Sequence, residues 1–161
     1  MRITGGGVTI RGLVINRFGG NGIHITGAGG NVIQGNYVGT NPGGTDDLGN
    51  GLDGIRIDNS ANNVIGGTTA QTRNIISGNN MHGVRIIGSA AVNNTVQGNY
   101  IGVNAGGSGP LGNTYNGIWV AKGASNNLIG GTAPGAGNVI SGNSDTGLEI
   151  QDSNSTGNRI E

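Results

Sequence analysis

The chain has 161 residues, of which 37 are glycine, 10% are charged and 3% are aromatic, and this composition excludes an ordinary helical or α/β core. Eight basic and eight acidic residues leave no net charge at pH 7, so we expect neither nucleic-acid binding nor membrane insertion. Cysteine is absent, which excludes disulfides and thiolate metal sites, and no apolar run reaches the length of a membrane span.

Short strand-like runs of three kinds recur along the chain, separated by glycine and without helical spacing. The earliest, Val8–Ile10, is of the second kind, Asn-x-apolar, although it lacks the asparagine. The first kind, Gly-apolar-x-apolar, occurs at Gly22–Ile25, Gly54–Ile57, Gly83–Ile86, Gly117–Val120 and Gly147–Ile150. The third kind is Asn-apolar-apolar, as in Asn74–Ile76. Parallel strands that recur once per unit, with no crossover helix, predict a coil.

A longer repeat contains pairs of these units. Asn31–Asn41 reads NVIQGNYVGTN and returns 63 residues later as NTVQGNYIGVN, from Asn94 to Asn104. Asn63–Thr68 likewise returns as Asn127–Thr132, after 64 residues. A period this long is typical of repeat architectures. The sequence therefore predicts an all-β fold: a parallel β-helix with three parallel sheets and about five coils, formed by residues 1–161 as a single domain with uncapped ends. We expect it to be a segment of a longer solenoid.

Asparagine recurs at positions that should face the interior. Side-chain alternation turns the apolar residues of each run inward, and the asparagine two positions earlier with them. The first inward column is Asn31, Asn63, Asn94, Asn127 and Asn158, and the second is Asn36, Asn74, Asn99 and Asn138. The column expected to close each coil, with left-handed corners, is Asn41, Asn79, Asn104 and Asn143. Stacked about 4.8 Å apart, such amides can hydrogen-bond in ladders that satisfy otherwise costly buried groups.

In its Gly-apolar-x-apolar strands and inward asparagine columns, the chain from about Gly20 onward resembles right-handed parallel β-helix repeat proteins of the pectin-lyase-like group. It is most similar to the GNYIGT, NxIGGT and NVISGN repeats of large bacterial surface or secreted proteins. The resemblance implies the fold and a secreted or cell-surface location, although the residues that follow Met1 do not form a signal peptide. It implies no particular activity, because this fold carries lyases, hydrolases, epimerases and scaffolds.

The outer face of the first strand is the best candidate for a ligand site, because sugar-active β-helices that this chain resembles use that face. The candidate binding residues are Arg56, His82, Arg85, Trp119 and Glu149. Arginine can hold a carboxylate of an anionic glycan, and tryptophan can stack on a sugar ring. The signatures of polygalacturonases, pectate lyases and alginate epimerases are missing, so no catalytic residue is assigned. Pairing of Arg85 with Asp53 or Asp58 explains the same residues without a ligand.

Two further features have a structural and a functional interpretation. Asp46, Asp47, Asn50 and Asp53 have the oxygen ligands that calcium prefers, but the equivalent loop of the second repeat lacks them. We therefore predict no metal site and no cofactor. The third strands present an apolar outward stripe of Tyr37, Ile75, Tyr100 and Val139. Either loops cover this stripe or it is a contact surface for self-association, for which the open ends are the other candidate.

These observations predict a non-catalytic structural or adhesive segment of a larger exported protein. The alternative is a module that binds or modifies polysaccharide through the strand-one face, in the manner of a lyase or epimerase. Ice binding would need a regular outward array of threonine, and the outward columns are too mixed for it.

Overall fold

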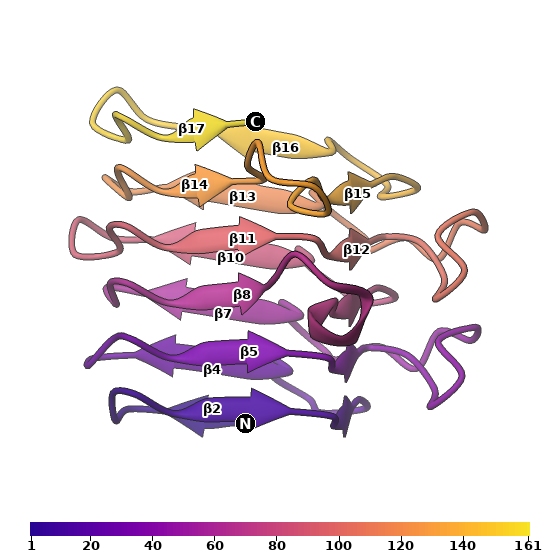
Figure 1. Cartoon of the computed structure of the whole chain (residues 1–161). Helices are drawn as coiled ribbons and strands as arrows, with labels where there is room; N and C mark the ends of the chain where they lie inside the picture. Colours follow the sequence, from indigo (N-terminus) through magenta and orange to yellow (C-terminus); the bar gives the residue numbers. More distant parts are fainter.

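The computed structural model describes residues 1–161 and is a right-handed parallel β-helix of about six coils, stacked one upon another (Figure 1). Sheet A consists of β1 (Arg2–Ile3), β4 (Ile23–Thr26), β7 (Ile55–Asp58), β10 (Val84–Ile87), β13 (Ile118–Ala121) and β16 (Leu148–Ile150). Sheet B consists of β2 (Thr9–Arg11), β5 (Val32–Gln34), β8 (Val64–Gly66), β11 (Thr95–Gln97), β14 (Leu128–Ile129) and β17 (Arg159–Ile160). Sheet C consists of β3 (Val14–Ile15), β6 (Tyr37–Val38), β9 (Ile75–Ile76), β12 (Tyr100–Ile101) and β15 (Val139–Ile140).

Three strands per coil, one in each sheet, confirm the architecture that the repeats predict. The sequence analysis identified the five later strands of sheet A, and β1 adds one at the N-terminal end, where Ile3 pairs with Ile25. The only helical segment is η1 (Ala70–Thr72), a short 3-10 turn between β8 and β9.

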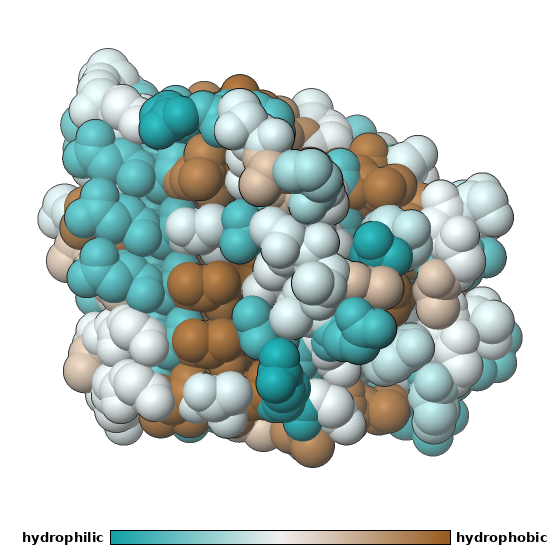
Figure 2. Space-filling model, in the orientation of Figure 1, coloured by the Kyte–Doolittle hydropathy of each residue, from teal (hydrophilic) through white to brown (hydrophobic).

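The core is a column of aliphatic side chains in register between coils. In sheet A, Ile57 of β7 pairs with Ile86 of β10, and Ile86 with Val120 of β13; all three are fully buried. The alternate positions point outward, and Figure 2 shows the resulting hydrophobic patches along sheet B, where Val32 and Val64 are partly exposed. Period two thus separates the core from the surface as predicted.

The first two asparagine columns form continuous ladders inside the turns, as predicted. In each interior member, the backbone N–H and the side-chain amide donate to the Oδ1 atom of the asparagine one coil further along, at 2.8 to 3.2 Å. The second amide hydrogen donates to a backbone carbonyl, for example from Asn94 to Ser60, except in Asn63, where it donates to the hydroxyl of Ser60. Most members are fully buried, whereas Asn138 and Asn158 in the last coils are partly exposed.

The third ladder differs from the predicted closing column. Its members are Asn50, Asn79, Asn113 and Asn143. Asn41 and Asn104 instead bind their own loops, since the Oδ1 atom of Asn41 accepts from the backbone of Thr45 and that of Asn104 from Gly109. In the two coils with a long loop after sheet C, the ladder asparagine follows the loop instead of preceding it.

The left-handed corners also lie elsewhere than predicted. No member of the closing column has a positive φ angle. Positive angles occur at many turns, among them Gly78 (77°) and Gly142 (75°), directly before Asn79 and Asn143. They recur in the residues just before the first-column asparagines: Gly30 (76°), Asn62 (59°), Asn93 (57°), Asn126 (56°) and Gly157 (68°). These turns lead into the strands of sheet B and carry the hydrophilic side chains at the left edge of Figure 2. Asparagine is one of the few residues other than glycine that tolerates this conformation.

Loops cover most of the apolar stripe on sheet C. The loops after β6 and β12 project at the right of Figure 1 and are joined by a hydrogen bond from Ala105 N–H to the Gly44 carbonyl, 2.9 Å. A Cβ atom at Gly44 would lie 2.8 Å from the ring of Tyr37, so this loop packs directly on the tyrosine. Gly107 lies in the same way on Tyr100. Ile75 is 5% exposed, and Val139 is the most exposed member of the stripe, at 36%.

All three ladders end in the first coil, where apolar residues stand in place of asparagine. The backbone N–H groups of Val8, Leu13 and Phe18 donate to the Oδ1 atoms of Asn31, Asn36 and Asn50. Their side chains add nothing to the ladders, and Leu13 and Phe18 are 41% and 50% exposed.

Candidate functional site on sheet A

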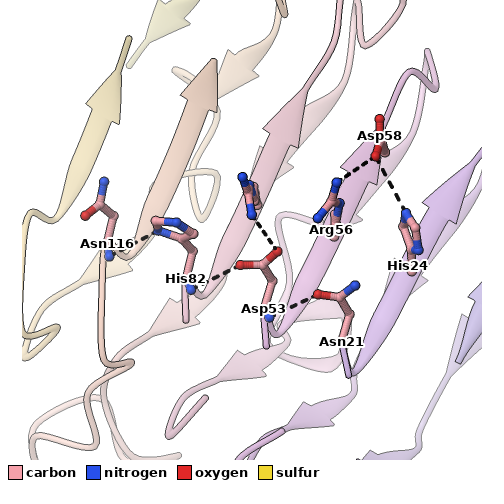
Figure 3. Close-up of polar contacts among 8 residues, drawn as sticks. Asn21, His24, Asp53, Arg56, Asp58, His82 and Asn116 are labelled. Carbon is pink, nitrogen blue, oxygen red and sulfur yellow. Dashed lines mark hydrogen bonds and ion pairs between the residues drawn. The ribbon is translucent and has the colours of Figure 1, made fainter. Parts of the chain in front are cut away.

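A fourth polar column runs along the entrance to sheet A, one residue before the glycine that opens each strand. It consists of Asn21, Asp53, His82 and Asn116 (Figure 3). The backbone N–H of Asp53 donates to Asn21 Oδ1 at 3.1 Å, that of His82 to Asp53 Oδ1 at 3.3 Å, and that of Asn116 to His82 Nδ1 at 3.3 Å. The side chains of Asn21, Asp53 and His82 therefore each accept from the coil above, which is the opposite direction to the asparagine ladders. Asn116 ends the column, because its Oδ1 atom has no hydrogen-bond partner.

The sequence analysis missed this column, although it named two of its members. The signal that could have revealed it is the polar residue just before each Gly-apolar-x-apolar motif. Asparagine at the column's ends, Asn21 and Asn116, is replaced by titratable residues at its centre, Asp53 and His82. This substitution puts a carboxyl and an imidazole group in a position that needs only a hydrogen-bond acceptor.

The carboxyl group of Asp53 is buried and lies beside Arg85, the pairing that the sequence suggested. Arg85 Nη1 is 3.6 Å from Asp53 Oδ2, and the side chains are 16% and 1% exposed. Burial raises the pKa of Asp53, and the charges of Arg85 and His82 only partly oppose it. Burial thus outweighs the ion pair, because the separation is too long for a hydrogen bond and Oδ2 has no other partner.

His82 and Trp119 form the aromatic part of the site. Their rings are stacked, with centroids 5.0 Å apart and planes 15° apart, and Tyr115 lies on the imidazole with its ring centroid at 5.7 Å. The guanidinium of Arg85 lies 4.5 Å from the centroid of the Trp119 ring. Burial lowers the pKa of His82, although the carboxylate of Asp53 opposes this. The imidazole is therefore neutral at pH 7 and accepts the hydrogen bond from Asn116.

The remaining predicted ligands are engaged in contacts of their own. Arg56 Nη2 lies 2.8 Å from Asp58 Oδ2, and His24 Nε2 lies 3.9 Å from the same oxygen (Figure 3). Burial alone would raise the pKa of Asp58, but the hydrogen bond and charge of Arg56 hold it below its usual range. Glu149 Oε2 accepts from Asn116 Nδ2 at 2.6 Å.

The structure thus brings four of the five predicted binding residues together. His82 and Arg85 both contact the ring of Trp119, and Glu149 joins them through Asn116. Arg56 lies on the neighbouring strand in a separate pair. Asp53 adds a carboxyl with a raised pKa close to an imidazole with a lowered pKa, a combination found in acid–base sites. However, Asp53 binds the backbone of His82, not its ring, so it does not orient the imidazole as a catalytic dyad would.

The possible calcium ligands do not converge. Asn50 is in the third ladder and Asp53 in the fourth column, while Asp46 accepts from Asn41 and Asp47 from the backbone of Gly49. No group of three or more His, Cys, Asp or Glu side chains is arranged to hold a metal ion. None of the helical segments has the length and hydropathy of a membrane span.

Comparison with known proteins identifies the fold family alone. The family model described as the right handed beta helix region matches residues 1–133. Neither the curated proteins nor the solved structures gave a match.

Proposed function

The chain belongs to the right-handed β-helix family, and from this premise we propose that it is a non-catalytic structural or adhesive segment of a larger exported protein, located at the cell surface or secreted. The observation that carries the proposal is that most buried polar side chains of the fold bind one another; the atoms left without a hydrogen bond are five, on sheet A and at its entrance. Three asparagine ladders follow the helix axis, and on sheet A Arg56 binds Asp58, Arg85 lies beside Asp53, and Glu149 binds Asn116.

A scaffold needs such internal pairing, whereas a ligand site needs polar groups left free for the ligand. Charged side chains that pair within the protein must lose those partners before they bind anything else, which costs free energy. The cavity of the structure lies on sheet C, away from these residues. A rigid β-helix whose charged side chains pair with one another is suited to hold other parts of a protein at a fixed distance.

Cell fractionation of the source organism, with an antibody against this chain, tests the location, and a screen for polysaccharide turnover tests the absence of catalysis. We expect the chain in the envelope or the medium and no release of unsaturated uronate product. A cytoplasmic location would contradict export. Turnover that is lost in Asp53→Asn and His82→Asn would contradict the non-catalytic role.

The second candidate, polysaccharide binding through sheet A, is favoured by one observation. Trp119 and Arg85 stand side by side in register on β13 and β10, and Arg56 is the neighbour of Arg85 on β7, at the spacing of adjacent strands. Two arginines one strand apart suit successive acid groups of an anionic glycan. Titration of Trp119 fluorescence with oligogalacturonate and alginate fragments tests this function. A saturable, salt-sensitive response that Arg85→Gln removes supports it, and a flat response at millimolar glycan rejects it.

A further inference from the structure

A pocket of about 390 Å³ lies on the outer face of sheet C, a different sheet from the candidate site described above. Tyr37 of β6 and Ile75 of β9 line it, together with Ala70, Arg73 and Ala105 from the surrounding loops. Figure 1 shows the loop between β8 and β9 curling over the strands of sheet C at this place. The volume is within the range of roughly 300–1,000 Å³ that is typical of small-molecule sites.

Arg73 is the one charged residue of the pocket lining and has no acidic partner. Its Nε atom donates to the carbonyl of Gly98 at 3.1 Å, and its guanidinium carbon lies 4.0 Å from the centroid of the Tyr100 ring. These two contacts fix the plane of the guanidinium, while its terminal nitrogens form no hydrogen bond with the protein. A fixed guanidinium fork with free terminal nitrogens is suited to bind a carboxylate with two hydrogen bonds.

The second long repeat shows that this arrangement is not a general feature of the coil. Tyr100 and Val139 repeat Tyr37 and Ile75, but Gly137 stands where Arg73 would be expected, 64 residues along. The structure has no second pocket. The second repeat therefore has the same strands and a similar loop, but neither the arginine nor a pocket. The pocket occurs only in the repeat that carries the arginine.

We propose that this pocket binds a small monocarboxylate with an apolar or aromatic body. Arg73 holds the carboxylate, and the body lies against Tyr37, Ile75, Ala70 and Ala105. One positive group matches one negative charge, and the other side chains of the wall are mostly apolar. The amide of Gln71, at the edge of the pocket, is available to a hydroxyl or carbonyl group of the ligand. The site is independent of the proposed scaffold role and of sheet A.

Phenylacetate, with the neutral phenylacetamide as its match in shape, is the probe. Calorimetry and NMR shifts of the Arg73 side chain and the Tyr37 ring should show saturable binding of phenylacetate, weaker by about tenfold or more for the amide, because a charge-assisted pair is lost. Arg73→Gln should weaken phenylacetate binding by a similar factor. Arg159→Gln, which removes an exposed arginine near the C-terminal end, should leave it unchanged.

A second variant protects the test against misfolding of the first. Ala70 is exposed at the mouth of the pocket, so Ala70→Trp should fill it without disturbing the core, and binding should be lost at an unchanged melting temperature. Equal binding of the acid and the amide, or of the wild type and Arg73→Gln, would overturn the role of the arginine. Inorganic phosphate or galacturonate binding as tightly as phenylacetate would overturn the apolar body of the ligand.

Discussion

The side-chain oxygen of Asn94 accepts two hydrogen bonds from Asn63, one from its backbone N–H at 2.9 Å and one from its side-chain amide at 2.8 Å. Asn94 in turn donates to the Oδ1 atom of Asn127 with the same two groups, both at 2.9 Å. Asn63 and Asn94 are both fully buried. The ladder is therefore a continuous chain in which each side chain completes the hydrogen bonding of its neighbours.

Replacement of Asn94 by alanine should lower stability strongly. It leaves the backbone N–H and one amide hydrogen of Asn63 buried without a partner, at about 1–3 kcal/mol each. We expect a total of about 3 kcal/mol or more, or a fall in melting temperature of about 6–12 °C for a domain of this size. Thr95→Ala, at the adjacent outward position, is the control and should change little. Equal melting temperatures for the two variants would contradict the ladder.

Asn113→Ala should cost far more than Asn104→Ala. The Oδ1 atom of Asn113 accepts from both the backbone and the side chain of Asn79, and its amide donates to Asn143 and Ile76. Asn104 only accepts, from the backbone of its own partly exposed loop. Urea unfolding should give a loss of about 3 kcal/mol for the first variant and less than about 1 kcal/mol for the second. The reverse order would show that the ladder precedes the loop, as the sequence alone suggested.

Gly83→Ala should disrupt the contact between coils. An added Cβ atom would lie 2.7 Å from the carbonyl oxygen of Gly117 and 2.7 Å from a methyl group of Ile101, closer than carbon atoms approach in packed proteins. Overpacking of this kind costs about 1–3 kcal/mol or more. At Gly147, the same place in a later coil, the nearest atom is 3.7 Å away, so Gly147→Ala should be nearly neutral. Thermal unfolding of the two variants makes the comparison, and similar losses would argue against tight stacking at the glycine.

Part of the loss of stability below neutral pH should come from His82. Because burial lowers its pKa in the folded chain, the neutral form stabilises the fold above the unfolded value of about 6.5, and this stability is lost as the pH falls through the folded pKa. His82→Asn keeps an acceptor for Asn116, as Asn21 of the same column provides one for Asp53. Its melting temperature should fall less between pH 7 and pH 5 than that of the wild type.

Two other groups must be considered in that measurement. His24 has a pKa lowered by burial and by the charge of Arg56, so His24→Gln should remove a further part of the pH dependence. Asp53 has a raised pKa, so its contribution is present below the unfolded value of about 3.8 and is lost as the pH rises through the folded pKa, which is the opposite trend. An unchanged pH profile in His82→Asn would contradict the buried neutral imidazole.

The isolated 161-residue chain should associate through its ends. The strands β1, β2 and β3 at one end, and β15, β16 and β17 at the other, each pair on one side only, and such edges are templates for other strands. Sedimentation over a wide concentration range should show oligomers. Charged substitutions at Leu13 and Phe18, which are exposed beside the first edge, should reduce them. A monomer at every concentration would contradict association through the ends.

The sequence by itself determined the parallel β-helix, its three sheets and its first two asparagine ladders. These features follow from local rules, because alternation along an extended chain assigns each side chain of Ile33 or Asn31 to one face, and the repeat stacks equal positions. Only the tertiary structure decided the third ladder and the fourth column. Asn41 and Asn50 lie at the two ends of one loop, and the spacing along the chain allows either of them to join the third ladder. The path of that loop across the coils decides which of them does.

The sequence likewise could not decide which carboxylate pairs with which arginine on sheet A. The sequence offered Asp53 and Asp58 as partners of Arg85, and the structure shows that Arg85 lies beside Asp53 while Asp58 binds Arg56. Arg85 lies one coil away from both carboxylates, so its distances to them are set by the register between β7 and β10 and not by spacing along the chain. Neighbouring coils therefore decide whether a polar side chain joins a ladder, joins an ion pair or keeps unpaired donors, as the terminal nitrogens of Arg73 do. Residues of neighbouring coils are about 25 to 39 positions apart in the sequence.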